Sequence, residues 1–325
     1  MHTSLTISEE NSGKRLDIFL VKKFPKKSRS KIQKEILKGM VLVNGKNTSV
    51  HHFIKTKDKI TFTPPISPPR EGEMAGVVER QWGVEPHIIY DDKNFIILEK
   101  PSGLLVHETS RKEPHTLVSW LLRKYPEIEN VGEDTYRAGI VHRLDKDVSG
   151  IMAVAKTQKM YEHLKNQFKK RSVTKEYIAL VYGTPLQHSG KINLPIGRNP
   201  QGKFVAHPRT QKRKLLMEDK NAVTLYRVRE RIKNFSVFEI QILTGRTHQI
   251  RAHLAYLGHP IVGDKEYGPK KAFHKMFSKK IKVIDAPRIM LHSHILKFKD
   301  LDGKLKKFQS PLPEEFIAFI DHIKS

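Results

Sequence analysis

The pattern of apolar and polar positions predicts a protein dominated by strands. Three segments are rich in β-branched and aromatic residues, which favour strands. They are "KEYIALVYG" (175–183), "AVTLYRVRE" (222–230) and "FSVFEIQIL" (235–243), and "FIILEK" (95–100) indicates a shorter strand. The segment "FKDLDGKLKKF" (298–308) predicts a hairpin around an Asp-Gly turn.

Helical spacing appears in two places between these strands. Apolar residues fall on one face of residues 159–170, at Met160, Leu164 and Phe168. Residues 245–258 show the same spacing at Ile250, Leu254 and Leu257, with Gly258 as the stop signal. Because helices are scattered among strands without strict βαβ alternation, we expect an α+β fold with a largely antiparallel mixed sheet flanked by helices.

A stretch rich in proline divides the chain. Residues 63–86, "TPPISPPREGEMAGVVERQWGVEP", contain five prolines and three glycines, which neither a helix nor a central strand tolerates. We therefore predict a small N-terminal domain over residues 1–63, a linker over 64–85 and a catalytic domain over 86–325.

The N-terminal domain combines two basic helices with a hairpin. Ten Lys or Arg residues and two acids occupy residues 14–38, and "MVLVNGK" predicts a strand that enters an Asn44-Gly45 turn. The predicted helices carry apolar residues at helical spacing, with a serine to cap the second: Leu16, Phe19, Leu20, Ser28 or Ser30, Ile32, Ile36 and Leu37. The segment "SRSKIQKEILKGMVLVNGK" also resembles the S4-like RNA-binding domain over Arg15 to about Thr61.

Composition narrows the classes of partner and chemistry. Lys and Arg number 60 against 34 acids, a formal charge of +26, which favours a polyanionic partner such as nucleic acid. The absence of cysteine excludes disulfides, thiolate zinc sites and cysteine nucleophiles. Without a secretory h-region in residues 1–11 or an apolar run of about 20 residues, we expect a soluble, cytoplasmic protein.

Candidate chemistry begins at "VHRLDKDVSG" (141–150). Asp145 follows two bases and precedes an apolar run, so it is either a structural partner of Arg143 or a carboxylate held at a core edge for a substrate. Arg246 falls in the first turn of the predicted helix 245–258, where a cation is unfavourable unless an anion joins it. Asp145 or an RNA phosphate would supply that anion.

A metal or nucleotide cofactor is not indicated. His248 and His253 lie about 140° apart on a helix, which differs from the i, i+4 pair of a helical zinc site. We interpret these histidines and His259, near Asp264, as packing residues or RNA contacts. GxGxxG, Walker A and GxSxG patterns in a suitable setting are absent, so we expect no cofactor.

Four motifs in order carry a family resemblance. "HRLDKDVSGIMAVAKT", "KEYIALVYG", "LTGRTHQIRAHLAYLGHPIVGDKEYG" and "LHS" resemble the RluA-type pseudouridine synthases, in the RluC/RluD-like branch with an S4-like domain. The resemblance spans most of residues 86–325 and implies an isomerase that converts specific uridines of structured RNA. Large-subunit ribosomal RNA is the expected substrate, and a monomer the expected state. The alternatives are transfer RNA, or a non-catalytic role in ribosome assembly.

The resemblance also implies roles for four residues. Asp145 falls on the family's catalytic aspartate, acting as nucleophile or as base at the sugar. Arg143 falls on the arginine that fills the space left by the flipped nucleotide, and Tyr177 on the tyrosine that stacks on the target base. Arg246 is matched to the basic residue that pairs with the aspartate.

Two positions depart from the family pattern. Val148 stands where the family usually has Thr, and Ser293 ends an "LHS" where the family has "LHA". Loss of the threonine hydroxyl removes a local hydrogen bond. We expect this loss to affect the rate or the choice of substrate and to leave the protein active.

Overall fold

The chain divides into two compact units, Met1–Gln81 and Trp82–Ser325. The computed structural model describes residues 4–25, 32–33, 35–36, 39–48, 52–62, 84–108, 113, 115–199, 201–206, 219–269 and 283–325. Most of the expected linker, the candidate helix caps Ser28 and Ser30, and Leu37 lie outside these residues. The domain boundaries 1–63, 64–85 and 86–325 therefore stay predictions.

The first unit packs helical segments against a small antiparallel sheet. The strands run in the order β1 (Ser4–Thr6), β4 (Lys59–Phe62), β2 (Val41–Val43) and β3 (Lys46–Asn47). Helix α1 spans Leu16–Lys23, a 3-10 turn spans Glu9–Asn11, and residues 32–33 and 35–36 are helical. The expected apolar positions form its core: Leu16, Phe19, Leu20, Ile32 and Ile36.

The expected hairpin in this unit is confirmed. Asn44 and Gly45 join β2 to β3 with φ angles of 52° and 74°. Asparagine and glycine are the residues that tolerate this left-handed pair of conformations, so the sequence determines the turn locally.

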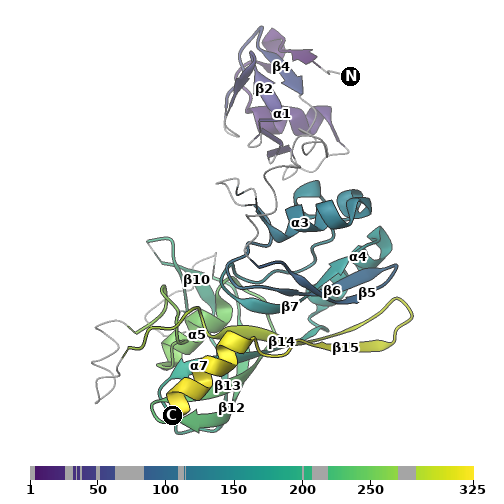
Figure 1. The fold of residues 1–325 in the computed structure, drawn as a ribbon. Coiled ribbons are helices and arrows are strands. Elements are labelled where there is room, and N and C mark those ends of the chain that lie inside the picture. Colours follow the sequence, from purple (N-terminus) through teal and green to yellow (C-terminus); the bar gives the residue numbers. More distant parts are fainter. Residues whose placement is uncertain are drawn as a thin grey trace. The chain divides into compact units, whose positions relative to one another are not determined.

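The second unit is built on one nine-stranded sheet (Figure 1). Its main path follows the order β5-β6-β7-β14-β8-β13-β12-β9, and β15 pairs with β14. The strands are β5 (His87–Asp91), β6 (Phe95–Lys100), β7 (Ser149–Ala155), β8 (Thr174–Tyr182), β9 (Ser189–Asn193), β12 (Val223–Ile232), β13 (Phe235–Ile242), β14 (Leu291–Lys299) and β15 (Leu305–Gln309). A separate hairpin pairs β10 (Ile196–Arg198) with β11 (Phe204–Ala206).

Helices α3 (Leu117–Lys124) and α4 (Gln158–Lys170) accompany the β5–β7 part of the sheet (Figure 1). Short 3-10 turns follow α3 at Pro126–Asn130 and Thr135–Arg137. Helix α5 (Gln249–Leu257) lies near β11 and β12, and α7 (Glu314–Lys324) ends the chain. The α+β prediction is confirmed, and β7 with β14 is the parallel pairing in an otherwise antiparallel described sheet.

The start of α5 differs from expectation. The sequence predicts a helix over 245–258, but the helix begins at Gln249, after His248 in the left-handed conformation. The Gln249 side chain accepts hydrogen bonds from the Arg246 backbone N–H at 3.1 Å and the Thr244 hydroxyl at 2.8 Å. These bonds hold the preceding segment as a turn, so Arg246 is in a loop and not in a helix.

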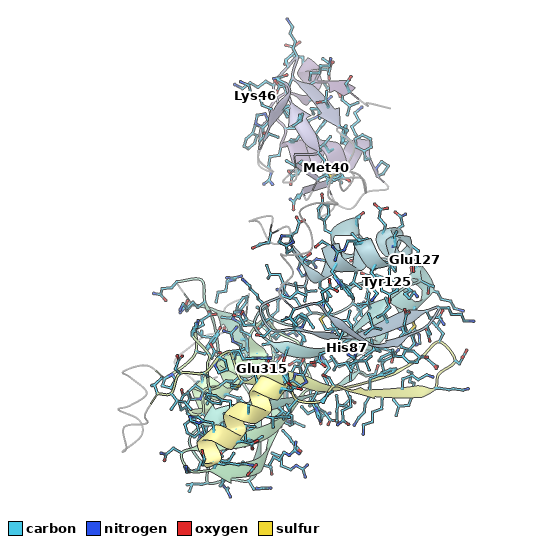
Figure 2. The ribbon with its side chains drawn as sticks, viewed as in Figure 1. Met40, Lys46, His87, Tyr125, Glu127 and Glu315 are labelled. Carbon is cyan, nitrogen blue, oxygen red and sulfur yellow. The ribbon has the colours of Figure 1, made fainter. Side chains whose placement is uncertain are left out.

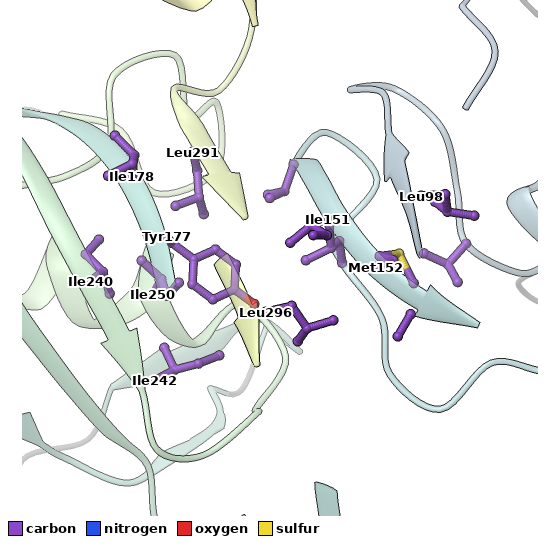
Figure 3. Packing of buried hydrophobic residues seen from close by; sticks show 14 of the residues in the cluster. Leu98, Ile151, Met152, Tyr177, Ile178, Ile240, Ile242, Ile250, Leu291 and Leu296 are labelled. Atoms are coloured by element: carbon purple, nitrogen blue, oxygen red, sulfur yellow. The ribbon is translucent and has the colours of Figure 1, made fainter. Parts of the chain in front are cut away.

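The core of the second unit continues through the middle of the sheet. Figure 3 shows Tyr177 among buried apolar side chains from β8, β13, β14 and α5, including Ile240, Ile250 and Leu291. Strand β7 is buried along all seven residues, which agrees with the apolar run that follows Asp145 in the sequence. Among the described residues, no helix is long and apolar enough to cross a membrane.

Polar and charged side chains connect peripheral elements to this core, and Figure 2 labels two of them, Tyr125 and Glu315. Tyr125, at the end of α3, donates to Asp91 of β5 at 2.7 Å, and Lys156 donates to the same carboxylate at 2.9 Å. On the other side, Arg288 donates to Glu315 of α7 at 2.9 Å and also to the Ser149 hydroxyl. The C-terminal helix is thereby connected to the first residue of β7.

Gly150 is required where β7 meets β14. Its φ is +119°, and a Cβ at this position would lie 2.2 Å from the Ser293 carbonyl oxygen. Both obstructing atoms, the Ser293 O and N, are backbone atoms of the paired strand, so they cannot rotate away.

We expect Gly150→Ala to destabilise the protein by about 2–4 kcal/mol, since it combines a left-handed residue with an overpacked contact. Gly303→Ala is the matched control, because Gly303 also has positive φ (+77°) but nothing lies within 4 Å of the added Cβ. Urea unfolding of both variants measures the difference. Equal losses would show that β14 moves aside and that the contact carries no cost.

Candidate active site

Asp145 lies in the loop that precedes β7, and the buried side chain of Lys100 donates hydrogen bonds that hold this loop in place. The Lys100 Nζ donates to the carbonyl oxygens of Lys146 at 2.9 Å, Pro101 at 2.7 Å and Leu104 at 2.8 Å. All three ammonium protons therefore have acceptors. Burial lowers the Lys100 pKa to about 7, aided by the charge of Arg288, while Asp147 and Asp145 oppose the shift.

The segment after Lys100 adds two further anchors. The Ser102 hydroxyl donates to the Asp147 carbonyl at 2.6 Å, and the Gly103 N–H donates to the Lys146 carbonyl at 3.0 Å. Within the loop, the Val148 N–H donates to the Asp145 carbonyl at 3.2 Å. The turn that presents Asp145 is thus formed by backbone bonds even with valine in place of threonine, and the Val148 side chain is buried.

His142 attaches the same loop to the core. Its Nε2 accepts the Ala153 N–H at 3.0 Å, and its ring stacks on Phe168 with centroids 4.7 Å apart. Burial, followed by the charge of Lys175, lowers the His142 pKa to about 3. A neutral imidazole is what this bond needs, because Nε2 must keep its lone pair to accept.

The Asp145 carboxylate is paired with Arg251. Its Oδ2 lies 3.2 Å from Arg251 Nη1 and 3.8 Å from His248 Nε2, and the side chain is 21% exposed. The Asp145 carboxylate is therefore ion-paired with Arg251 and still partly accessible to solvent.

Arg251 is itself fixed by a second acid. Its Nε and Nη2 donate to the two oxygens of Asp264 at 2.7 and 3.0 Å, a bidentate pair. Burial disfavours the charged guanidinium, but the bonds and charge of Asp264, and then those of Asp145, outweigh it, so the Arg251 pKa is raised above its ordinary value. The clamp leaves Nη1 directed at Asp145.

The expected pairing of Arg246 with Asp145 is wrong. Arg246 Nε instead donates to the Asn221 carbonyl at 3.1 Å, and Arg251 makes the ion pair. The physical reason is the late start of α5, which leaves Arg246 in the loop and places Arg251 in the first turn of the helix. A role of Arg246 in binding RNA stays a prediction.

His248 lies beside the pair with a defined tautomer. Tyr267 donates its hydroxyl proton to the Phe204 carbonyl at 2.6 Å, so it accepts at 3.1 Å from His248 Nδ1. The neutral ring consequently carries its lone pair on Nε2, the atom nearest Asp145. Burial lowers the His248 pKa, and the charge of Asp145 opposes that shift.

Tyr177 and Ser293 form a buried pair. Burial raises the Tyr177 pKa, while its hydrogen bond with Ser293 opposes that rise and the charge of Asp145 adds to it. The Ser293 hydroxyl also donates to the Ile151 carbonyl at 3.3 Å. The departure from alanine therefore gives the Tyr177 hydroxyl a partner that an alanine would not supply.

Arg143 is exposed, and its Nη1 lies 3.2 Å from His107 Nε2. The charge of Asp145 acts on it, but no ion pair joins the two side chains among the described residues. The local alternative, an Asp145 held structurally by Arg143, is therefore wrong for this structure. The expected role of Arg143 in the space of a flipped nucleotide stays a prediction.

The other histidines have protein partners of their own. His253 Nδ1 lies 2.9 Å from the Thr224 hydroxyl, and its Nε2 lies 3.0 Å from the Leu194 carbonyl oxygen. His259 Nδ1 lies 2.8 Å from the Tyr182 carbonyl oxygen. In the part of the chain that the structure describes, no three metal-ligating side chains gather.

Sequence reasoning missed two residues of this site. Arg251 lies in the same motif as Arg246. The signal for it was Asp264, an acid that could pair with an arginine but that the sequence analysis considered only as a possible metal ligand. Lys100 ends the predicted strand 95–100, and the signal for it was its position directly before Pro101, where the strand stops.

Comparison with known proteins identifies the family of each part of the chain. Residues 94–256 match the model of a family described as RNA pseudouridylate synthase, and residues 14–60 match the S4 domain. The structure resembles human RNA pseudouridylate synthase domain containing 1, with a TM-score of 0.56 and 25% identity, over 74% of this chain and 87% of that one.

Curated relatives match this chain over almost its whole length. An uncharacterised RNA pseudouridine synthase of Bacillus subtilis is 34% identical and covers 98% of this chain and 97% of its own length. Ribosomal large subunit pseudouridine synthase D of Escherichia coli is 35% identical, over 98% of this chain and 94% of its own. Because the family model spans the segment with Asp145 and Arg251 and these relatives match almost the whole chain, the chain belongs to the RNA pseudouridylate synthases, isomerases that act on RNA, and carries an S4 domain.

Proposed function

We propose that this enzyme isomerises specific uridines of large-subunit ribosomal RNA, with Asp145 as the reacting carboxylate. The observation that carries the catalytic assignment is the Asp145–Arg251 pair, a half-buried carboxylate on a fixed loop with its charge balanced and its surface accessible. The substrate assignment is supported by the full-length relative from Escherichia coli, whose name specifies the large ribosomal subunit.

The chemistry fits side chains alone. Isomerisation breaks the N1–C1′ bond of a uridine, turns the base and forms a C5–C1′ bond. The C5 proton leaves and N1 gains one, so atoms and electrons balance without an external oxidant or reductant. An ionised Asp145 serves either as nucleophile at the sugar or as base, and both roles require the charge that Arg251 balances.

Extrusion of the target base is part of the proposal. A stacked base hides its glycosidic bond, and removing it from the stack costs a few kcal/mol. We assign Arg143 to the space that the base leaves and Tyr177 to stacking on the base, with Arg246 on the RNA backbone. The exposed guanidinium of Arg143, two residues from Asp145, supports the first assignment.

A pseudouridine map of total RNA from cells with and without the gene tests this function. Loss of specific sites in large-subunit ribosomal RNA is the expected result. Loss of sites in transfer RNA instead would show that transfer RNA is the substrate. An unchanged map together with altered ribosome assembly would favour the non-catalytic alternative.

The N-terminal unit is expected to contribute phosphate contacts. Removing residues 1–81 should weaken RNA binding and flatten its salt dependence, since each phosphate contact contributes about −0.7 to −0.9 to the slope of log K against log salt. Affinity for a ribosomal RNA transcript, measured between low and moderate salt, checks this. A truncated protein with the full-length slope would show that these bases do not touch RNA.

A further inference from the structure

Three cations gather where α4 ends and β8 begins. Lys175 is the second residue of β8, and its Nζ would lie 3.5 Å from a Cβ added to Gly245, the residue before Arg246. Arg171 ends α4 in the left-handed conformation, and the Lys175 Nζ lies 5.7 Å from the Phe168 ring centroid in the last turn of that helix. Two distant loops therefore bring Arg171, Lys175 and Arg246 together.

No carboxylate balances this cluster. Among the described residues, Arg171, Lys175 and Arg246 take part in no ion pair, and the nearest acid in sequence, Glu176, is paired with Lys297 at 2.8 Å. The side-chain bond of Arg246 goes to a neutral carbonyl, that of Asn221. Three like charges remain beside one another on a partly buried surface.

Such an arrangement is unfavourable in the free protein. Burial, followed by the charges of Arg171 and Arg246, lowers the Lys175 pKa to about 8. Burial and Arg171 lower the Arg246 pKa in the same way. A bound anion would raise the pKa of both Lys175 and Arg246, because an opposite charge within about 4–6 Å favours the protonated amine and guanidinium.

The position of the cluster identifies the anion. Lys175 and Tyr177 lie on the same face of β8, about 6.5 Å apart along the strand. Lys175 also acts on His142, which lies on the loop that carries Asp145. An anion at the cluster is therefore about one nucleotide away from a base stacked on Tyr177.

We propose that Arg171, Lys175 and Arg246 form a binding site for a backbone phosphodiester that flanks the target uridine. The site holds the RNA strand while the base leaves the stack, and it adds affinity without touching the reacting atoms. This inference rests on the proposed function for the identity of the RNA, while the site itself is defined by charge and geometry.

The test compares Lys175→Gln with Lys175→Arg and with Lys191→Gln, a single-charge control at an exposed position of edge strand β9. The probe is a large-subunit ribosomal RNA transcript. Lys175→Gln should raise the Kd about tenfold at low salt and reduce the magnitude of the salt slope by about 0.7–0.9. The single-turnover rate at saturating RNA should stay within about threefold, and Lys175→Arg should retain most of the affinity.

A neutralised linkage locates the contact. Methylphosphonate substitution at each linkage flanking the mapped uridine should weaken binding to the wild type but add little to the loss in Lys175→Gln. Failure of the inference would appear as an unchanged salt slope in Lys175→Gln, or as a lost saturating rate with normal affinity. The salt slope is independent of the pseudouridine map, so a wrong substrate would leave the slope change intact while the map showed no lost ribosomal site.

Discussion

Replacing Asp145 by Asn is expected to lower the single-turnover rate by at least about 10³-fold, because the amide supplies neither a nucleophilic carboxylate nor a base. The Asn oxygen can still accept from Arg251, so the loop and its anchors at Lys100 remain in place. RNA affinity should change by only a few-fold, since most of it comes from backbone contacts. Release of tritium from uridine labelled at C5 measures the rate.

Asp147→Asn is the matched control for this change. Asp147 is exposed, lies on the same loop two residues further on, and contributes its backbone carbonyl to the anchor from Ser102. The substitution removes the same charge and keeps that carbonyl, so the rate is expected to remain within about threefold of wild type. Turnover of Asp145→Asn near that of the control would disprove the assignment of Asp145.

Local signals in the sequence were sufficient for most of the fold. The Asn44-Gly45 turn, strand 95–100 and helix 159–170 follow from residues adjacent in the chain, and the structure has each of them. Their determinants are backbone conformation and side-chain periodicity, which act over one turn or one strand. Such features need no knowledge of distant contacts.

The composition of the site depended on distant contacts instead. Whether Arg246 or Arg251 meets Asp145 is decided by the residue at which α5 begins, and Gln249 sets this through bonds to Thr244 and Arg246. Lys100 is buried because the loop around Lys146 closes over it, 46 residues along the chain. Neither contact leaves a periodic pattern, so the sequence predicted the motif and not the partner.

The corrected pairing makes Arg251 the second residue with a large expected effect. Arg251→Lys should lower the single-turnover rate by about 10²-fold, since an ammonium cannot hold Asp264 through two bonds and also point a third donor at Asp145. Arg251→Ala should lose nearly all activity. It also leaves the Asp264 side chain, which is 0% exposed, without its cation, at a cost of about 3–5 kcal/mol in stability.

The split between saturating rate and RNA affinity separates a positioning role from a role in RNA binding. Arg251 Nη1 donates to Asp145 Oδ2 at 3.2 Å, so losing this bond acts on the orientation of the reacting carboxylate. The saturating single-turnover rate should therefore fall in Arg251→Lys while the Kd for RNA changes by only a few-fold, measured at a temperature where the variant is folded. Arg246→Lys should instead raise the Kd for RNA more than it lowers the saturating rate. If Arg246→Lys lowers the saturating rate and Arg251→Lys does not, the loop carrying Arg246 closes onto Asp145 when RNA binds, and Arg251 serves only to hold Asp264.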